Sequence, residues 1–231
     1  MSYNTVIEEK DNLFNPFSPM FLKTELEEKE RLDLLECVED ARINQKVESS
    51  GIIVGQNANE AQKNSITAGE MEVIVGDWQF ENHDNIIRKV VNRYITKFAL
   101  KYKNHTDTYW SFKDAYGESG QGRITEERCR TPEISDCWYV IMRDGDFHML
   151  HSHDVEHCMI SGAIYLEIPD FKFPQGMMNW VVTGNKKFSN EVFRLCPKNG
   201  DVMIWPSWIL HTVYPFRGNG ERKMISFNGY F

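Results

Sequence analysis

The sequence predicts a mainly β protein with a helical N-terminal part, in which the C-terminal part forms a jelly-roll or cupin-like barrel of antiparallel strands. After residue 135, short apolar runs alternate with turn residues such as Asp144-Gly145 and Lys198-Asn199-Gly200. This spacing is typical of antiparallel strands. No long helical pattern lies among these runs. Strands joined by turns alone bury their apolar sides against one another, and a closed or doubly layered barrel achieves this.

The first 135 residues are predicted to form a helical and loop segment that packs on the barrel. An amphipathic pattern predicts a helix over residues 23–45, and a broader apolar stripe predicts a second helix over residues 84–102. Residues 48–69 are rich in Asn, Ser and Gly, and residues 104–135 lack a clear periodicity. We expect both stretches to form loops, the second of them near the mouth of an active site.

Residues 136–231 are predicted to form the barrel, which together with the N-terminal segment makes one structural domain. Eight strands are expected, near residues 137–142, 147–153, 159–168, 177–182, 191–196, 202–205, 209–214 and 222–227.

The composition argues against several classes of protein. The formal net charge of the 231 residues is −8, whereas a surface that binds nucleic acid needs a basic footprint. No apolar run approaches the ~18 residues that span a bilayer, and the first residues lack a signal-peptide pattern. The five cysteines contain no CxxC pair and are interpreted as reduced, packed residues. We therefore expect a cytoplasmic protein that has neither nucleic acid nor membrane as a partner.

Histidines cluster in one part of the predicted barrel. His148, His151, His153 and His157 fall within ten residues of the chain. His151 and His153 are two residues apart, so an extended backbone projects both imidazoles to the same face. His211 belongs to a distant predicted strand, which an antiparallel barrel can bring alongside. Imidazoles suit zinc, copper, iron or nickel, and a facial set of three ligands is typical of non-haem iron oxygenases. For His148 and His157 we expect ordinary surface or hydrogen-bonded roles.

Four linked motifs extend this pattern. HSH at residues 151–153 is followed by ISGAIYL at 160–166, GDVMIWPSWILH at 200–211 and ERKMISFN at 221–228. In this order the motifs resemble those of the iron(II)- and 2-oxoglutarate-dependent oxygenases of bacteria and marine phages, over residues 136–229. The resemblance implies a double-stranded β-helix, Fe(II) held by three protein ligands, and 2-oxoglutarate and O2 as co-substrates.

The resemblance also implies which residues bind the metal. His151 and His211 match the first and the distal histidine of the superfamily. Where the superfamily has Asp or Glu two residues after the first histidine, this chain has His153, and Asp154 follows it. Strand parity favours His153, whereas the need for an anionic ligand at higher iron oxidation states favours Asp154. The preferred set is His151, His153 and His211, with Asp154 as the alternative ligand.

Three further residues match the co-substrate site. Arg222 lies where the superfamily has the cation that binds the distal carboxylate of 2-oxoglutarate, and a guanidinium can bind a carboxylate through two parallel hydrogen bonds. Tyr165 matches a position whose phenol donates to the same carboxylate. Ser226 shares the strand face of Arg222 and is expected to help hold the co-substrate.

The implied reaction converts 2-oxoglutarate to succinate and CO2 while a substrate is oxidised, with hydroxylation of a C–H bond as the expected outcome. The substrate is predicted to be a small molecule or a protein side chain, and a phage-encoded protein would work in the host cytoplasm. Two other function classes remain open. A cupin-like metalloenzyme without 2-oxoglutarate would not need Arg222 inside the barrel, and a non-catalytic barrel would only bind a ligand.

The choice between the two candidate ligands can be tested by substitution. We expect His153→Ala to weaken iron binding more than Asp154→Ala does, because strand parity directs residue 153 to the same side as His151. Equilibrium titration of each purified variant with iron(II) measures the two affinities. The reverse order would mean that the chain twists after His151 and that Asp154 is the ligand.

Overall fold

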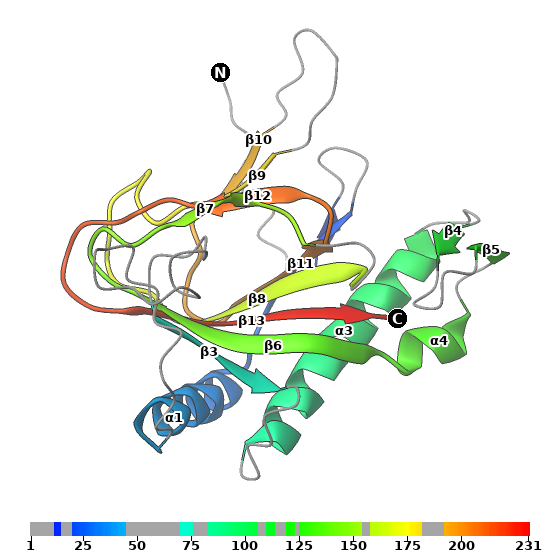
Figure 1. Ribbon diagram of the computed structural model, residues 1–231, viewed down its shortest axis with the longest axis horizontal. Helices are drawn as coiled ribbons and strands as arrows, with labels where there is room; N and C mark the ends of the chain where they lie inside the picture. Colours follow the sequence, from blue (N-terminus) through cyan, green and yellow to red (C-terminus); the bar gives the residue numbers. More distant parts are fainter. Residues whose placement is uncertain are drawn as a thin grey trace, which may run out of the picture.

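Two antiparallel β-sheets that face each other form the body of the protein (Figure 1). In spatial order, the larger sheet contains β1 (Asn12–Phe14), β2 (Phe21–Glu25), β11 (Asp201–Pro206), β8 (Ile160–Glu167), β13 (Arg222–Tyr230), β6 (Glu133–Met142) and β3 (Glu70–Val75). The smaller sheet contains β10 (Val192–Leu195), β9 (Met178–Val181), β12 (Leu210–Val213) and β7 (His148–His151). This computed structural model describes residues 12–14, 20–44, 70–75, 83–105, 110–113, 119–122, 125–153, 158–181 and 192–231.

Strands β6 to β13 form a double-stranded β-helix, which confirms the predicted fold. β6, β8, β11 and β13 are neighbours in the larger sheet, and β7, β9, β10 and β12 make up the smaller one. The chain therefore passes repeatedly between the sheets as it is followed from β6 to β13. All eight strands expected after residue 135 are present, with small shifts at their ends.

Apolar side chains fill the space between the two sheets, and we call this cluster the inner core. Successive side chains of a strand point to opposite faces, so every second residue of each barrel strand points inward. Tyr165 and Met224 enter the inner core from the larger sheet, and Met178 and Trp180 enter it from the smaller one. Each of these four side chains is at most 5% exposed. The inner core thus keeps bulk water out of the barrel.

Two helices cover the other face of the larger sheet (Figure 1). They are α1 (Glu28–Asn44) and α3 (Asp84–His105). Their buried side chains, among them Val38 and Ile95, pack with outward residues of the sheet such as Phe227. The sheet is therefore buried on both faces, which explains why β8 is apolar along most of its length rather than alternating. The second predicted helix is confirmed and extends to His105 instead of ending at residue 102.

The N-terminal part differs from the prediction in two places. The sequence pattern starts the first helix at residue 23, but Phe21–Glu25 forms β2, which pairs with β11. Phe21 and Leu22 are completely buried on opposite faces of this strand, so sheet pairing outweighs the helical pattern that follows. The expected loop at residues 104–135 contains β4 (Trp110–Lys113), β5 (Ser119–Gly122), α4 (Glu126–Arg130) and the start of β6. The expected loop at residues 48–69 lies outside the described residues.

Strands from the N-terminal part extend the larger sheet on both sides. β2 lies beside β11 at one side, and β3 lies beside β6 at the other. The first 135 residues therefore contribute strands as well as helices, and the division of the chain at residue 135 stays a prediction.

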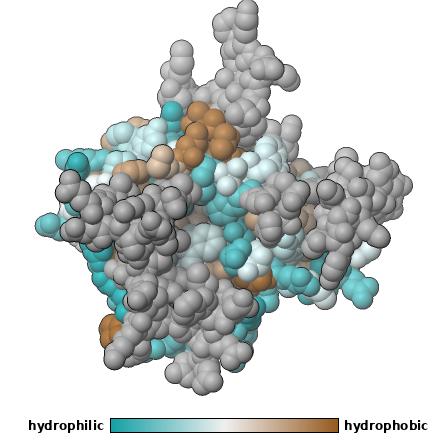
Figure 2. All heavy atoms as spheres, in the orientation of Figure 1, coloured by the Kyte–Doolittle hydropathy of each residue, from teal (hydrophilic) through white to brown (hydrophobic). Residues whose placement is uncertain are grey.

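The described surface is mixed in character. On the face drawn in Figure 2 it is largely hydrophilic, with a hydrophobic patch near the top of the view. Among the described residues, no helix combines the length and the apolar content needed to cross a membrane. None of the five cysteines forms a disulfide, and four of them are buried, whereas Cys196 is exposed and differs from the packed residues that the sequence predicts.

Gly162 allows β8 and β13 to pack closely. It lies opposite Phe227 in the sheet, and a Cβ atom at Gly162 would lie 2.1 Å from Cζ of the Phe227 ring. We expect Gly162→Ala to lower the free energy of unfolding by about 1–3 kcal/mol, because the ring must leave its place in a buried core. Urea unfolding followed by circular dichroism measures the change. Phe227→Leu in the same background should recover part of the loss, and an alanine variant as stable as the parent would contradict the close approach.

Candidate active site

Three histidines, one on β7, one just after it and one on β12, converge at one place. His151 is the last residue of β7, His153 follows two residues later, and His211 is the second residue of β12. The antiparallel register places His211 directly opposite His151. One ring nitrogen from each of the three side chains lies within 4.8 Å of the others. The structure therefore brings together the three residues that the sequence selects, while Asp154 lies outside the described residues.

Two of the rings are oriented by hydrogen bonds to the backbone. Nδ1 of His151 lies 2.8 Å from the carbonyl oxygen of Met149, and Nδ1 of His211 lies 2.9 Å from that of Ile209. A carbonyl oxygen only accepts, so Nδ1 of each ring carries the proton. Nε2 of each ring therefore has a free lone pair, which is the atom that a metal ion can use.

The third ring is held by side chains of the larger sheet. Nδ1 of His153 lies 2.5 Å from Oδ1 of Asn228 and 3.2 Å from Oγ of Ser161. The backbone N–H of His153 donates to the carbonyl oxygen of Ser207 at 3.0 Å. Nε2 of His153 points the other way and lies 3.2 Å from Nε2 of His151. Two facing lone pairs at this distance repel each other unless a cation or a proton lies between them.

Burial keeps these imidazoles neutral near pH 7. It lowers the pKa of His151 to about 4 and lowers the pKa of His153. For His211 it lowers the pKa well below the usual range, and the neighbouring His151 adds to the effect. A lowered pKa means that each ring is unprotonated on Nε2 at neutral pH. The donor set therefore fits a divalent transition metal, since neutral imidazole is the form that coordinates.

A fourth imidazole adjoins the three. His148 stacks on His151 with the ring centroids 4.1 Å apart. Its pKa is lowered well below the usual range, chiefly by burial and further by His151, His153 and Arg222. The expectation for His148 was an ordinary surface or hydrogen-bonded role, and the structure shows a half-buried side chain stacked on His151. His157, for which the same role was expected, lies outside the described residues.

Arg222 and Tyr165 lie together inside the barrel. Both side chains are completely buried, and the guanidinium carbon of Arg222 lies 5.1 Å from the centroid of the Tyr165 ring. Nη1 of Arg222 donates to the carbonyl oxygen of Gly176 at 2.7 Å. Burial lowers the pKa of Arg222 and raises the pKa of Tyr165 to about 12. At neutral pH the site therefore contains a guanidinium cation and a neutral phenol.

These two side chains leave several donors unsatisfied. Nε and Nη2 of Arg222 and Oη of Tyr165 are buried without a hydrogen-bond partner among the described residues. A buried donor that lacks a partner typically costs about 1–3 kcal/mol. A carboxylate would accept from all three atoms and would also neutralise the guanidinium, so this arrangement fits an anionic ligand.

Ser226 lies on the same face of β13 as Arg222, as its strand position predicts. It is half-buried and pairs in register with Ala163 of β8 and Trp138 of β6. Met224 lies between Ser226 and Arg222 on this face. The structure thus places Ser226 in the barrel, next to the site of Arg222 and Tyr165 but nearer the histidine end of β13.

Ser161, Asn228 and Asp136 have no role that the sequence predicts. A signal for the first two is present, because Ser161 has the strand parity of Tyr165 and Asn228 has the strand parity of Arg222. Which partners these polar side chains meet could not be read from parity alone, since that depends on the register of β6, β8 and β13.

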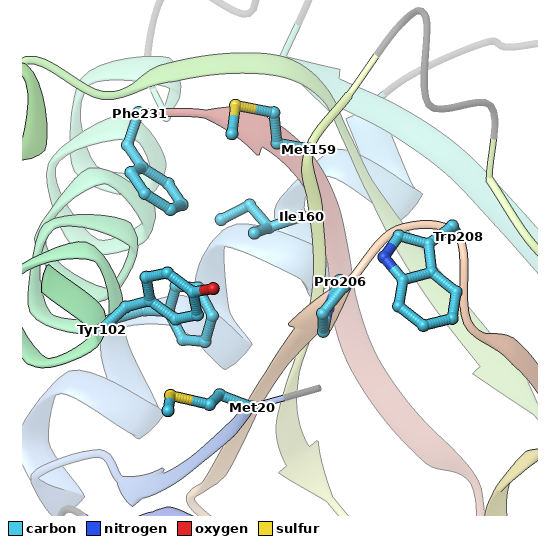
Figure 3. A pocket seen from close by; sticks show the side chains of 8 residues that line it. Met20, Tyr102, Met159, Ile160, Pro206, Trp208 and Phe231 are labelled. Carbon is cyan, nitrogen blue, oxygen red and sulfur yellow. The ribbon is translucent and has the colours of Figure 1, made fainter. Parts of the chain in front are cut away.

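An apolar hollow lies between α3 and one end of the larger sheet (Figure 3). It is lined by Met20, Phe98, Tyr102, Met159, Ile160, Pro206, Trp208 and Phe231. None of these is a histidine or an acidic or basic residue, so the hollow is not the centre of the chemistry. Pro206 and Trp208 flank Ser207, however, so the turn that holds the backbone of His153 packs against this hollow.

Residues 136–228 match a protein-family model described as "Putative 2OG-Fe(II) oxygenase". The matched stretch includes the three converging histidines, Tyr165 and Arg222. Comparison with curated proteins gives no match.

Solved structures with a similar fold include the following three. A prolyl-4-hydroxylase of Pseudomonas putida has a TM-score of 0.55 at 12% identity, with 91% of each chain covered. A prolyl hydroxylase of Trichoplax adhaerens, in complex with a hypoxia inducible factor peptide fragment, has a TM-score of 0.56 at 15% identity, with 91% of this chain and 83% of that chain covered. HygX of Streptomyces hygroscopicus, with nickel and 2-oxoglutarate bound, has a TM-score of 0.52 at 8% identity, with 91% and 82% covered. At these identities the likeness is one of fold.

Proposed function

Because residues 136–228 match the family model described as a 2OG-Fe(II) oxygenase, we propose that this protein is an iron(II)- and 2-oxoglutarate-dependent dioxygenase that hydroxylates a C–H bond of its substrate. One observation carries the proposal: three converging imidazoles and a completely buried arginine share one barrel. When bound there, iron(II) and 2-oxoglutarate supply oxidation of the substrate by O2, with release of succinate and CO2.

His151, His153 and His211 are the proposed iron ligands, each through Nε2. Support comes from their Nδ1 atoms, which already have acceptors and so leave Nε2 free. Burial keeps the three rings neutral, so the metal does not compete with a proton at pH 7. Asp154 stays the alternative ligand in place of one histidine.

Arg222 and Tyr165 are proposed to bind the distal carboxylate of 2-oxoglutarate, with Ser226 as a third contact. The unsatisfied donors of Arg222 and Tyr165 support this role. Met224 and Trp180 belong to the apolar cluster around Arg222, and they would exclude water from the bound co-substrate. In a site that excludes water, the attraction between guanidinium and carboxylate is stronger than at the surface.

The burial of Arg222 favours the oxygenase over its two rivals. A cupin-like metalloenzyme that uses no 2-oxoglutarate has no need for a cation inside the barrel. A non-catalytic barrel that binds a ligand has no need for three imidazoles with converging lone pairs. A single molecule of 2-oxoglutarate that is bound to both the metal and Arg222 would explain why the barrel contains both the three imidazoles and the arginine.

For the substrate, we propose a small molecule or a protein side chain with an apolar portion. The structural neighbours include prolyl hydroxylases, one of them in complex with a peptide. Met149 and Leu150, which precede His151 on β7, are 54% and 52% exposed, and they offer an apolar surface beside the histidines. The proposed location is the cytoplasm, of the host cell if the protein is phage-encoded, and five cysteines that form no disulfide are consistent with a reducing compartment.

Iron-dependent conversion of 2-oxoglutarate to succinate tests the proposed function. The purified protein should form succinate in air when iron(II) and ascorbate are present, and candidate substrates should increase the rate. His211→Ala should reduce the rate to that of iron alone, because two protein ligands hold a metal ion far less tightly than three. Labelled 2-oxoglutarate and chromatography of the products measure both rates. Equal rates in parent and variant would remove His211 from the metal site.

Arg222→Ala tests the co-substrate site separately from the metal site. Removing one partner of a buried charged pair typically costs about 3–5 kcal/mol, so the affinity for 2-oxoglutarate should fall by roughly two to three orders of magnitude. Arg222→Lys should recover only part of the loss, because an ammonium group cannot donate in parallel to both carboxylate oxygens. Calorimetric titration of the anaerobic iron(II) protein measures these affinities.

Arg217→Ala is the matched control for this series. Arg217 is exposed and pairs with Asp144 on the surface, so its loss should leave the affinity for 2-oxoglutarate unchanged. If Arg222→Ala binds 2-oxoglutarate as tightly as the Arg217 variant does, the co-substrate assignment is wrong and the cupin-like function becomes the better one.

A further inference from the structure

Asn228 is the centre of a chain of hydrogen bonds that ends on His153. Its Oδ1 lies 2.5 Å from Nδ1 of His153 and accepts a second hydrogen bond from Oγ of Ser161 at 2.8 Å. Its Nδ2 donates to Oδ2 of Asp136, 3.4 Å away. Ser161 and Asn228 are 1% and 8% exposed. This part of the hydrogen-bond network therefore lies inside the protein, and only its Asp136 end is exposed.

The direction of every hydrogen bond in this chain follows from its exposed end. The Oδ2 atom of Asp136 accepts from Nδ2 of Asn228, so the amide of Asn228 turns its NH2 group toward Asp136. The amide oxygen then faces His153 and Ser161, and both of them must donate to it. His153 therefore carries its proton on Nδ1, and its Nε2 keeps a lone pair. This is the nitrogen that lies beside His151 in the proposed metal site.

The network ties a residue outside the strands to three adjacent strands. β7 ends at His151, so strand pairing does not hold His153. Asn228 of β13, in contrast, lies in register with Asp136 of β6 on one side and with Ser161 of β8 on the other. The position of Asn228 is thus fixed by the larger sheet, and through it the ring of His153 is fixed relative to that sheet.

We propose that Asn228, held by Asp136 and Ser161, is a positioning residue for the metal. It fixes His153 in the Nδ1–H tautomer and directs Nε2 toward the site shared with His151 and His211. The proposal rests on the proposed function, because it assigns a role to residues that support a proposed iron ligand. Asn228 also connects the carboxylate of Asp136 to a ligand set that consists only of neutral imidazoles. Partners of this kind typically change metal affinity by about 10–100-fold.

The tautomer of His153 in the metal-free protein is the direct test. Long-range 1H–15N NMR of 15N-histidine protein, with the signal assigned through His153→Gln, reports which ring nitrogen carries the proton. We expect Nδ1–H in the parent and a substantial Nε2–H population in Asn228→Ala. The swap variant Asn228→Asp/Asp136→Asn keeps an acceptor next to His153 and should keep the Nδ1–H form. An unchanged tautomer in Asn228→Ala overturns the proposal.

Metal affinity is the second measurement. Anaerobic titration with cobalt(II), followed by its visible absorption, should show affinity about 10–100-fold lower in Asn228→Ala than in the parent, with recovery in the swap variant. Asn179→Ala is the matched control. Asn179 is also buried, but its Nδ2 donates to the carbonyl oxygen of Met177, so cobalt affinity should not change. Equal affinities in Asn228→Ala and Asn179→Ala overturn the proposal.

Two features keep the test decisive. If Asn228→Ala does not fold, Asp136→Asn takes its place, because an exposed asparagine can both donate and accept and so lets the Asn228 amide rotate. A His153 tautomer that stays purely Nδ1–H in that variant overturns the proposal, and a mixture supports it. If the parent binds no cobalt, the proposed function fails, whereas the tautomer of the metal-free protein still decides the role of Asn228.

Discussion

The pairing of β12 with β7 is the constraint on which the rest of the site depends. His151 and His211 are about sixty residues apart in the chain, and the antiparallel register alone sets them opposite each other. β12 lies between β7 and β9, and Leu210–Val213 pairs residue by residue with β9. A slip of one residue would turn His211 to the outer face of the sheet. The metal site therefore depends on the register of the whole smaller sheet.

Whereas the smaller sheet contributes neutral imidazoles, the larger sheet contributes a cation and polar side chains. It places a permanent cation, Arg222, among apolar side chains at the start of β13, and polar partners, Ser161 and Asn228, at the histidine end. The cation and the unsatisfied donors around it lower the stability of the ligand-free fold, since buried donors without partners are costly. A dianionic co-substrate that bridges the metal and the arginine would offset this cost, so that stability and ligand binding are linked.

Much of this architecture could be predicted because strands and turns leave local signals. The eight barrel strands were visible as apolar runs between turn residues, and His151, His153 and His211 as imidazoles on those strands. The predicted start of the first helix at residue 23 was wrong, because residues 23–25 belong to β2 and pair with β11, and the helix begins at Glu28. The strands at 110–113 and 119–122 gave no periodic signal. The network around Asn228 could not be predicted, since its members meet only through the register of three strands, and Asp154 lies outside the described residues.

The central claim is that one molecule of 2-oxoglutarate reaches from a metal ion on the three histidines to Arg222. The most direct test is the visible absorption of the anaerobic iron(II) protein during titration with 2-oxoglutarate, because a charge-transfer band arises only when the 2-oxo acid chelates the iron. The account predicts that the band appears at one equivalent, and that 2-oxobutyrate, which lacks the distal carboxylate, produces it only at much higher concentration. No band with either acid, or equal affinity for both, would contradict it.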